Sequence, residues 1–271
     1  CAGGIRYQFN TDVNIRLSKK SLKMIDEFEE ETGQPALVKK CGYIFVLTCA
    51  KDVEVFKKSV ELQHSLGVNT EWLEGDEIQK ITSPCLFTDA LAGTFNADEG
   101  LADPNSIVMG YINAAQKQGV ICITDCCATE IVLKSNKVNK VKTSSGEIHT
   151  ECVVNTCGPW SATLGKTIGL EIPVSPIRRQ WFITDTLLTL PAEFPFVIDF
   201  SQNLYFHREG SGLLSGMSNP REKIGEDQSI DPEWELEHIE AAIKRMPMLE
   251  YTGIRTRRAG LYEVTPDAHP I

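Results

Sequence analysis

The chain has 271 residues, of which 42% are hydrophobic and 24% are charged, and its formal net charge is −10. This length supports one large or two modest domains with a sizeable core, and the composition is ordinary for a globular protein. The negative charge argues against a nucleic-acid-binding surface, and the longest apolar runs, such as Tyr43–Leu47, are far too short to span a bilayer.

Nine cysteines stand at positions 1, 41, 49, 85, 122, 126, 127, 152 and 157. Their number is odd, their spacing is irregular and no CxxC pair occurs, so a metal site is not expected. Most of them lie in apolar, strand-like runs, which indicates buried, reduced thiols in a cytoplasmic protein. The adjacent pair Cys126 and Cys127 leaves a redox role open.

The two ends of the sequence carry no targeting signal that we recognise. The chain begins at Cys1 without a signal sequence and ends at Ile271 in what reads as the middle of a strand. A mature lipoprotein and an excised fragment would both begin with a residue other than Met. We expect both ends to be internal to a longer protein.

Helices and short strands alternate over the first hundred residues. Residues 1–10 are glycine-rich and form either a loop that approaches a ligand or a frayed terminus. A helix is predicted over residues 14–32, with Leu17, Met24, Ile25 and Phe28 on its buried face. The next predicted elements are two strands within 37–49, a helix over 52–66 capped by Asp52, a short exposed helix within 71–80 and strands within 86–96.

A well-marked helix begins at Asp103 and Pro104, because these residue types are favoured at the N-cap and at the first helical position. Its predicted buried stripe consists of Ile107, Val108, Tyr111, Ile112 and Ala115. Strands are then predicted over residues 120–124, 129–134, 138–143 and 148–155. A small meander before a return strand is typical of flavin-binding folds and not of simple nicotinamide dehydrogenases.

Residues 151–164, ECVVNTCGPWSATL, form the junction after this meander. They predict a buried strand over 152–154, a turn through Gly158 and Pro159, and the start of a helix. The free backbone N–H groups of such a helix N-terminus can hold a phosphate or the edge of a polar ring. A purely structural role is the alternative, because strand–Gly–Pro–helix junctions are common.

The rest of the chain predicts an antiparallel sheet. Its strands are expected over residues 173–185, 196–200, 204–208, 213–217 and 253–264. A helix follows Asp231 and Pro232, with Leu236, Ile239, Ile243 and Met246 on its buried face. We therefore predict a mixed α/β fold in which α/β pieces are interleaved with an antiparallel β-sheet and its flanking helices.

Five stretches together resemble one family of flavoenzymes. The stretches are AGGIRYQF (residues 2–9), GLADPNSIVMGYINAAQKQGV (100–120), VVNTCGPWS (153–161), YFHREGSGLLSGM (205–217) and AGLYEVTPDAHPI (259–271). In order and spacing they are similar to the FAD-dependent amine and amino-acid oxidoreductases, which include D-amino-acid oxidase, glycine oxidase, sarcosine oxidase and dimethylglycine dehydrogenase. The resemblance covers nearly the whole chain, and it does not specify a substrate.

The resemblance implies a FAD-binding domain interleaved with a substrate domain. Residues 1–33 and 103–172 would form part of the first, residues 34–102 and 173–262 the second, and residues 263–271 would return to the first. Gly3, Gly4 and Arg6 would face the flavin ring, and Ala128 would offer its backbone to the adenine. The wall on the phosphate side would consist of Thr156, Cys157, Gly158 and Trp160.

Two parts of the family pattern are missing from these 271 residues. The N-terminal part of this sequence contains no strand followed by GxGxxG, and the glycine-rich segment that follows TPDAHPI in the family is also not among these residues. The chain therefore resembles the middle of such an enzyme. We expect FAD in the intact protein, and weakened FAD binding and no activity in this segment alone.

The expected reaction removes a hydride equivalent from a carbon next to an amine nitrogen, with oxygen or an electron-acceptor protein as oxidant. Arg6 would stabilise negative charge on the reduced flavin, and Tyr205 and His207 would share one sheet face and line the substrate cavity. The alternatives are that Arg6 is an ordinary surface charge and that His207 is solvated or hydrogen-bonded without a role in the site. A carboxylate clamp could come from Arg178, Arg179, Arg255, Arg257 or Arg258, most of which we expect to be surface charges.

Tyr262 departs from the family pattern. It stands where the amino-acid oxidases of this family usually carry an arginine for the substrate carboxylate, and tyrosine adds no charge. This favours a substrate such as sarcosine, dimethylglycine or proline. A glycerol-phosphate-type dehydrogenase and a non-catalytic subunit of the same fold stay open, as do an oligomer and a hetero-subunit arrangement.

Overall fold

The computed structural model describes residues 2–271, so Cys1 lies outside the described part of the chain. Two compact units are present. The first contains the chain up to Gln118 together with Gln180–Asn219 and Ser229–Arg258, and the second contains Gly119–Arg179, Pro220–Gln228 and Ala259–Ile271. These units are defined by packing and not by contact with a cofactor. The division into a FAD-binding and a substrate domain therefore stays a prediction.

The first unit is built on an eight-stranded sheet in the order β14-β10-β13-β12-β11-β3-β5-β4. Its strands are β3 (Tyr43–Leu47), β4 (Glu71–Leu73), β5 (Ala92–Asn96), β10 (Ser175–Thr184), β11 (Phe196–Asp199), β12 (Leu204–Glu209), β13 (Gly212–Met217) and β14 (Ile254–Val264). Strands β11 and β3 pair in parallel, whereas β10–β13, β11–β12, β12–β13, β3–β5 and β4–β5 are antiparallel. The predicted mixed α/β fold with a large sheet is confirmed. Strands β10 and β14 continue into residues of the second unit.

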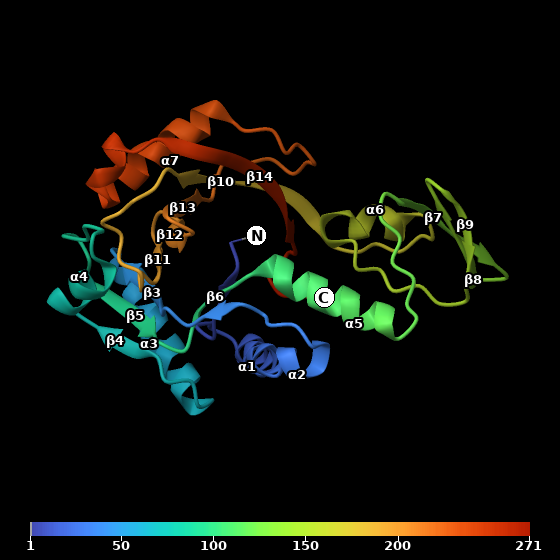
Figure 1. Cartoon of the computed structure of the whole chain (residues 1–271), viewed down its shortest axis with the longest axis horizontal. Helices are drawn as coiled ribbons and strands as arrows, with labels where there is room; N and C mark the ends of the chain where they lie inside the picture. The colour runs from blue at the N-terminus through green and yellow to red at the C-terminus, as the bar shows by residue number, and fades with distance from the viewer. Residues whose placement is uncertain (1) are drawn as a thin grey trace. The chain divides into compact units, whose positions relative to one another are not determined.

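A small sheet and most of the helices complete the first unit. The small sheet has the order β1-β6-β2, with β1 (Gly4–Ile5), β2 (Val38–Lys39) and β6 (Gly100–Ala102). The helices are α1 (Asp12–Asp26), α2 (Phe28–Thr32), α3 (Ala50–Ser65), α4 (Asp76–Thr82), α5 (Pro104–Lys117), α7 (Pro232–Arg245) and the 3₁₀ helix η2 (Pro247–Tyr251). Helix α7 lies on one side of the large sheet, and α1 and α5 lie on the other (Figure 1).

The two faces of the large sheet bury different side chains, because successive residues of a strand point to opposite faces. Leu213, Phe206 and Val197 are fully buried on the face that α7 covers, where they pack with Trp234 and Ala242. This cluster is the main core of the unit. A second cluster, built on Tyr43, Phe45 and Phe196, is aromatic.

The helix starts were predicted more accurately than the buried helix faces. Asp103 caps α5 by accepting a hydrogen bond from the Asn105 N–H at 3.0 Å, and Asp231 caps α7 in the same way. The predicted stripe of α5 is partly wrong: Ile107, Ile112 and Ala115 are half-buried, but Val108 and Tyr111 are exposed. Gly110, which was not predicted, packs on the ring of Phe28. An apolar stripe shows that a helix has a buried face, but the neighbouring elements decide which side that is.

The other helices show similar differences from the predicted faces. Ile15 and Leu22 are buried in α1, and the predicted Leu17 and Met24 are exposed. In α7 only Leu236 of the predicted residues is exposed, at 59%, whereas Ile239, Ile243 and Met246 pack into the main core as predicted. Cys49, not Asp52, occupies the N-cap position of α3.

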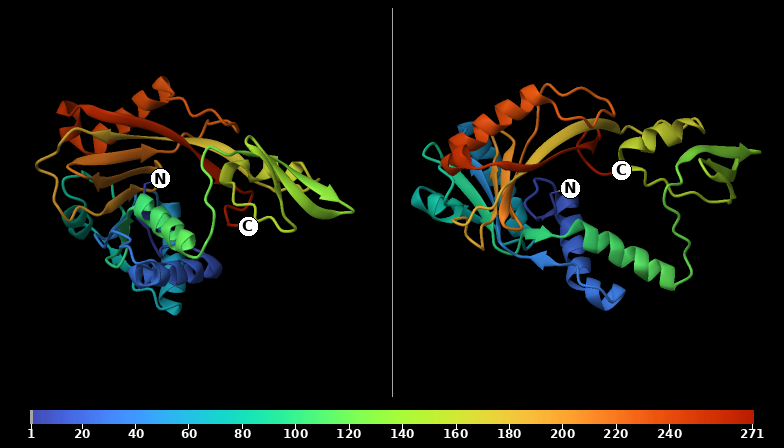
Figure 2. Two further views of the ribbon diagram at one scale, coloured as in Figure 1. Left: turned by 45° about the vertical axis from the view of Figure 1, so that its right-hand side comes forward. Right: turned by 45° about the horizontal axis from the view of Figure 1, so that its top comes forward.

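The second unit contains a three-stranded meander and short helices. The elements are β7 (Ala128–Lys134), β8 (Lys137–Thr143), β9 (Gly146–His149), the 3₁₀ helix η1 (Gly158–Trp160) and α6 (Ser161–Lys166). Strands β7 to β9 form a twisted antiparallel sheet, drawn in green to yellow in Figure 2. The predicted meander is therefore present.

The strands predicted over residues 120–124 and 152–154 are wrong. Both segments are irregular, and Ile121 and Val154 are 84% and 80% exposed. A strand forms only where a neighbour completes its hydrogen-bond ladder, and no strand within residues 2–271 pairs with either segment. The first residues of the junction 151–164 thus form an irregular segment and not a buried strand.

The eight described cysteines are free thiols. The prediction that they are buried is wrong for most of them: Cys85 is buried, whereas Cys122, Cys127 and Cys152 are exposed. Apolar neighbours in sequence do not bury a residue unless another element covers that segment. No helix within residues 2–271 is both long and apolar enough to cross a membrane.

A matched pair of substitutions tests the position of the core. Leu213→Ala removes a fully buried side chain, and we expect it to lower the free energy of unfolding by about 2–5 kcal/mol. Leu236→Ala is the same change at a largely exposed helical site, where the effect should stay within about 0.5 kcal/mol. Urea denaturation measures both. Equal losses would show that the face of α7 is assigned incorrectly.

Candidate functional site

Strand register puts the predicted site residues Tyr205 and His207 on one face of the large sheet, which we call the aromatic face. Opposed residues of neighbouring strands point to the same face. Tyr205 lies opposite Gly216 and Ile198, and His207 lies opposite Leu214. This face includes Tyr43, Phe45, Trp181, Ile183, Phe196, Ile198, Tyr205, His207, Leu214 and Gly216.

Stacked rings form the centre of the aromatic face. The ring centroids of Phe196 and Tyr43 are 4.3 Å apart at an interplanar angle of 10°, and Tyr205 stacks on Phe196 at 5.5 Å. The Tyr205 ring lies across Gly216, where a Cβ atom would overlap it. A glycine at position 216 therefore lets Tyr205 lie flat against the sheet.

The N-terminal loop packs on the same rings. A Cβ atom on Gly4 would be 3.0 Å from Phe196 Cε2 and 3.3 Å from Tyr43 Cε2, so the backbone itself contacts the aromatic face. The Arg6 guanidinium carbon lies 4.5 Å from the ring centroid of Phe9 and 5.3 Å from that of Phe45. These are cation–π distances, and they place a positive charge beside the stacked rings.

A buried carboxylate that sequence reasoning missed holds this loop. Glu99 is fully buried and accepts hydrogen bonds from the N–H groups of Tyr7 and Gln8 and, at 2.6 Å, from Gln8 Nε2. Gln8 also accepts a hydrogen bond from Thr94 Oγ1 at 2.7 Å. Burial raises the pKa of Glu99 to about 7, and these hydrogen bonds oppose the rise. Glu99 thereby fixes the backbone next to Arg6.

His207 is a buried and uncharged member of the aromatic face. Burial lowers its pKa to about 4, so the imidazole is neutral at physiological pH. Its Nδ1 lies 3.0 Å from the Arg208 carbonyl oxygen, which assigns the ring proton to Nδ1. Nε2 then carries a lone pair, and it has no hydrogen-bond partner within residues 2–271.

A cavity of about 420 Å³ lies on the aromatic face. Trp181, Ile183 and Leu214 line it from the sheet, and Ala2 and Pro104 line it from the N-terminal loop and the start of α5. Trp181 was not predicted as a site residue. The signal that could have found it is its alternation with Ile183 along β10.

The second unit contains a larger cavity of about 750 Å³. Gly158 and Tyr262, both predicted site residues, line it together with Asn155, Arg179 and Glu263. Gly158 has a φ of +53° and open space where a Cβ atom would point, so its backbone faces the cavity without a side chain. The structure therefore places Gly158, from the predicted cofactor wall, and Tyr262, which departs from the family pattern, in the lining of the same cavity.

Several other predicted site residues do not line this cavity. Ala128, at the start of β7, and Thr156 are exposed, and Cys157 is half-buried. Trp160 is 42% exposed, and its Nε1 donates to Glu226 at 2.9 Å. No group of three or more His, Cys, Asp or Glu side chains in the described chain is arranged to hold a metal ion.

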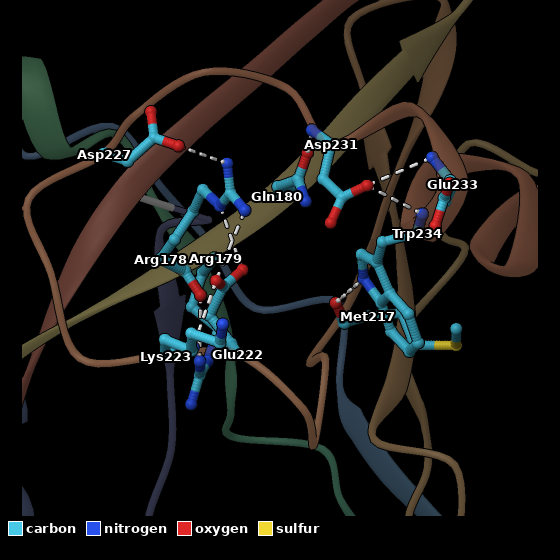
Figure 3. A network of polar contacts seen from close by, with 10 residues as sticks. All are labelled: Arg178, Arg179, Gln180, Met217, Glu222, Lys223, Asp227, Asp231, Glu233 and Trp234. Carbon is cyan, nitrogen blue, oxygen red and sulfur yellow. Dashed lines mark hydrogen bonds and ion pairs between the residues drawn. The ribbon is translucent and has the colours of Figure 1, made fainter.

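The arginines predicted as a clamp have different partners. Arg178 donates to Glu222 and to Asp227 at 2.9 and 3.0 Å, as Figure 3 shows. Arg257 forms an ion pair with Glu235 at 2.7 Å, and Arg255 and Arg258 are exposed. Arg179 alone of the five lines the larger cavity.

The fold agrees with the comparisons with known proteins. The family described as FAD dependent oxidoreductase matches residues 1–271, and this chain belongs to that family. Its relatives are flavin-dependent enzymes, and the family implies FAD as cofactor.

Three relatives show how much of a protein the chain covers. Human dimethylglycine dehydrogenase, mitochondrial, is 27% identical over 290 residues, which cover 100% of this chain and 34% of that protein. Human sarcosine dehydrogenase, mitochondrial, is 28% identical over 285 residues, which cover 99% and 31%. A crystal structure of L-proline dehydrogenase from P. horikoshii has a TM-score of 0.90 and 28% identity, and the match covers 100% of this chain and 72% of that one. The chain thus spans about a third of the length of the two curated mitochondrial dehydrogenases.

The buried carboxylate predicts a pH dependence of stability. Because the pKa of Glu99 is about 7 in the folded protein and about 4.3 in an unfolded chain, the folded state holds this proton more tightly. The stability from this group is thus complete below about pH 4.3 and is lost as pH rises through about 7. Relative to Glu99→Gln, the free energy of unfolding of the wild type should fall by about 3 kcal/mol between pH 5 and 8.

Denaturation in urea at both pH values measures this difference. Glu61→Gln is the control, because Glu61 is exposed and its substitution should leave the pH dependence of the wild type unchanged. Parallel pH profiles for the wild type and Glu99→Gln would contradict a raised pKa at Glu99.

Proposed function

We propose that the intact protein oxidises the C–N bond of an N-methylated amino acid or of proline. The names of the relatives support this substrate class, because they include dimethylglycine, sarcosine and L-proline dehydrogenases. When bound, FAD would accept the hydride from the carbon next to the substrate nitrogen. The protein binds and orients the substrate and excludes water from it.

The observation that carries the proposal is the charge pattern of the aromatic face. Tyr205 is the half-buried ring of the stack and can receive an alkylated ammonium group on its π-face, whereas Tyr43 and Phe196 are buried and support it. Neutral His207 adds no positive charge that would repel the ammonium, and its Nε2 can accept a hydrogen bond from it. Arg6, at the edge of these rings, suits an anionic group.

The residues that are present fit part of a FAD site. Gly158 lines a cavity whose volume is within the range of cofactor sites, and its backbone is accessible there. Gly158 and Asn155 would hold the cofactor in the second unit. Contacts of Gly3, Gly4 and Arg6 with the flavin ring, and of Ala128, Thr156, Cys157 and Trp160 with the rest of FAD, are part of this proposal.

Two other functions are less well supported. A glycerol-phosphate-type dehydrogenase needs a basic pocket for a phosphate, but Arg178 and Arg257 are paired with carboxylates and Glu263 lines the larger cavity. A non-catalytic subunit would have no need for a buried unpaired His207. Oxygen or an electron-transfer protein remains the proposed oxidant, and free thiols are consistent with a reducing compartment such as the cytoplasm.

Anaerobic flavin reduction tests the proposed function. The full-length protein, purified with FAD, should be bleached by sarcosine, dimethylglycine or L-proline, and glycine and D-alanine should be at least tenfold less effective. Stopped-flow absorbance measures both rates. Efficient reduction by glycine or D-alanine, with none by the N-alkylated substrates, would overturn the proposal.

The glycine under Tyr205 supplies a second test. Gly216→Ala places a Cβ atom where the Tyr205 ring lies, so we expect the ring to move and kcat/KM to fall at least tenfold. Gly225→Ala is the matched control, because no atom lies within 4 Å of the added methyl group. Similar activities for the two variants would show that Tyr205 does not contribute to the site.

A further inference from the structure

The carboxylate of Glu99 lies directly beside the N-terminal loop, among groups that suit a negative charge. Its Oε1 accepts hydrogen bonds from the backbone N–H groups of Tyr7 and Gln8, and its Oε2 accepts one from Gln8 Nε2 at 2.6 Å. All three partners are N–H donors, which match the ionised form of a carboxyl group. Glu99 has no exposed surface, so this charge is held away from water.

The cation that acts on Glu99 is Arg6, one residue before Tyr7. Burial raises the pKa of Glu99 to about 7, and the positive charge of Arg6 is among the influences that oppose this rise. The two side chains thus interact electrostatically, and the backbone between Arg6 and Gln8 joins them. Each charge therefore alters the potential that the other one produces around the loop.

Aromatic rings hold the Arg6 guanidinium without neutralising it. Its central carbon lies 4.5 Å from the ring centroid of Phe9 and 5.3 Å from that of Phe45. A π-face attracts a cation but carries no net charge. Because a guanidinium stays protonated in proteins, the net charge of this part of the loop depends on Glu99. Arg6 and Glu99 together are neutral when Glu99 is ionised and carry one positive charge when it is protonated.

The other titratable groups that face this loop do not supply such a change. Burial, Asp26, Asp98 and Glu99 all raise the pKa of the Tyr7 phenol above its usual value of 10, so it stays neutral at physiological pH. Asp26 forms an ion pair with Lys40 at 3.4 Å. Among the described residues around the loop, Glu99 is the group whose pKa is moved into the neutral range.

The proposed function places Arg6 at the flavin ring. Reduction adds negative charge to a flavin, and a nearby cation favours the reduced form. A buried anion next to that cation has the opposite effect. One unit charge about 10 Å away, at an effective dielectric constant of about 20, changes an equilibrium constant about tenfold.

We infer that Glu99 is a positioning residue that tunes the flavin site through Arg6: its ionised carboxylate offsets the charge of Arg6 and makes reduction of the flavin less favourable. The inference rests on the proposed function and adds a pH-dependent control to it. Glu99 contacts neither the cofactor nor the substrate. Its protonation changes the charge of the site without removing the loop from the aromatic face.

The test compares the wild type with Glu99→Gln in the full-length holoenzyme. Glu99→Gln removes the charge and keeps an oxygen for the two backbone N–H groups. At pH 8.5 its FAD should be about tenfold easier to reduce, which is about 30 mV in the two-electron potential. At pH 5.5, where Glu99 of the wild type is itself protonated, the two proteins should agree within about twofold. Equilibration with a redox dye measures the potentials.

Two outcomes of this comparison would overturn the inference. A lower potential in Glu99→Gln than in the wild type would show that the substitution moves Arg6 away from the flavin. A difference of the same size at both pH values would show that the charge of Glu99 is not its cause.

Thr94→Val is the matched control for a disturbed loop. Thr94 is buried, and its hydroxyl donates to Gln8 Oε1 at 2.7 Å, so the substitution breaks a hydrogen bond of the same network and changes no charge. It should lower the midpoint of urea denaturation and leave the flavin potential within about twofold at both pH values. A shift like that of Glu99→Gln would assign the effect to the loop and refute the inference.

A carbon-13 NMR titration of the Glu99 carboxyl group needs no variant at position 99 and no turnover. Glu99 should titrate near pH 7 in the wild type and at higher pH in Arg6→Gln, because Arg6 lowers its pKa. Equal midpoints would show that Arg6 does not act on Glu99 and would overturn the inference.

The dye experiment also separates this inference from the proposed function, because it reduces FAD without an amine. A pH-dependent shift in a protein that oxidises no N-alkylated amino acid would support the role of Glu99 and refute the proposed substrate. Amine oxidation without the shift would support the proposed substrate and refute the role of Glu99.

Discussion

The period-two alternation of the large sheet is the constraint on which the rest of the structure depends. With β12 in register with β11 and β13, Phe206 must enter the main core when Tyr205 and His207 point to the opposite face. A slip of one residue would exchange these roles. The core under α7 therefore holds the aromatic face in place, and the same register opens a gap over Gly216 for the Tyr205 ring.

The buried polar side chains differ in whether the protein itself supplies their hydrogen-bond partners. Glu99 and Arg178 have their hydrogen-bonding capacity used by the protein itself, and both fix a segment, the N-terminal loop in one case and residues 220–228 in the other. His207 Nε2 and Arg179 Nε are buried without partners among the residues described. Because unpaired polar groups are costly, these two groups are the better guide to a ligand site.

Element starts and strand alternation could be predicted because they depend on local chemistry. Asp103 and Asp231 cap their helices through bonds to residues two or three positions away. The buried faces of α1, α5 and α7 could be predicted only in part. Ile239, Ile243 and Met246 of the predicted α7 face pack into the main core as predicted. Leu17, Val108 and Leu236 are exposed, although they are as apolar as the residues that are buried. The predictions of strands at residues 120–124 and 152–154 were wrong for a related reason. A strand needs a neighbouring strand to pair with, and the local sequence does not show whether one is present.

By itself, the sequence determined the family and the alternation of β12 that puts Tyr205 and His207 on one face. Both follow from motifs or from short-range periodicity. Only the tertiary structure decided that Glu99 binds the loop of Arg6 across more than ninety residues, that Arg178 is neutralised and that Arg179 is not. The physical reason is that the charge environment of a side chain depends on which distant carboxylates and rings the fold brings within a few ångströms of it.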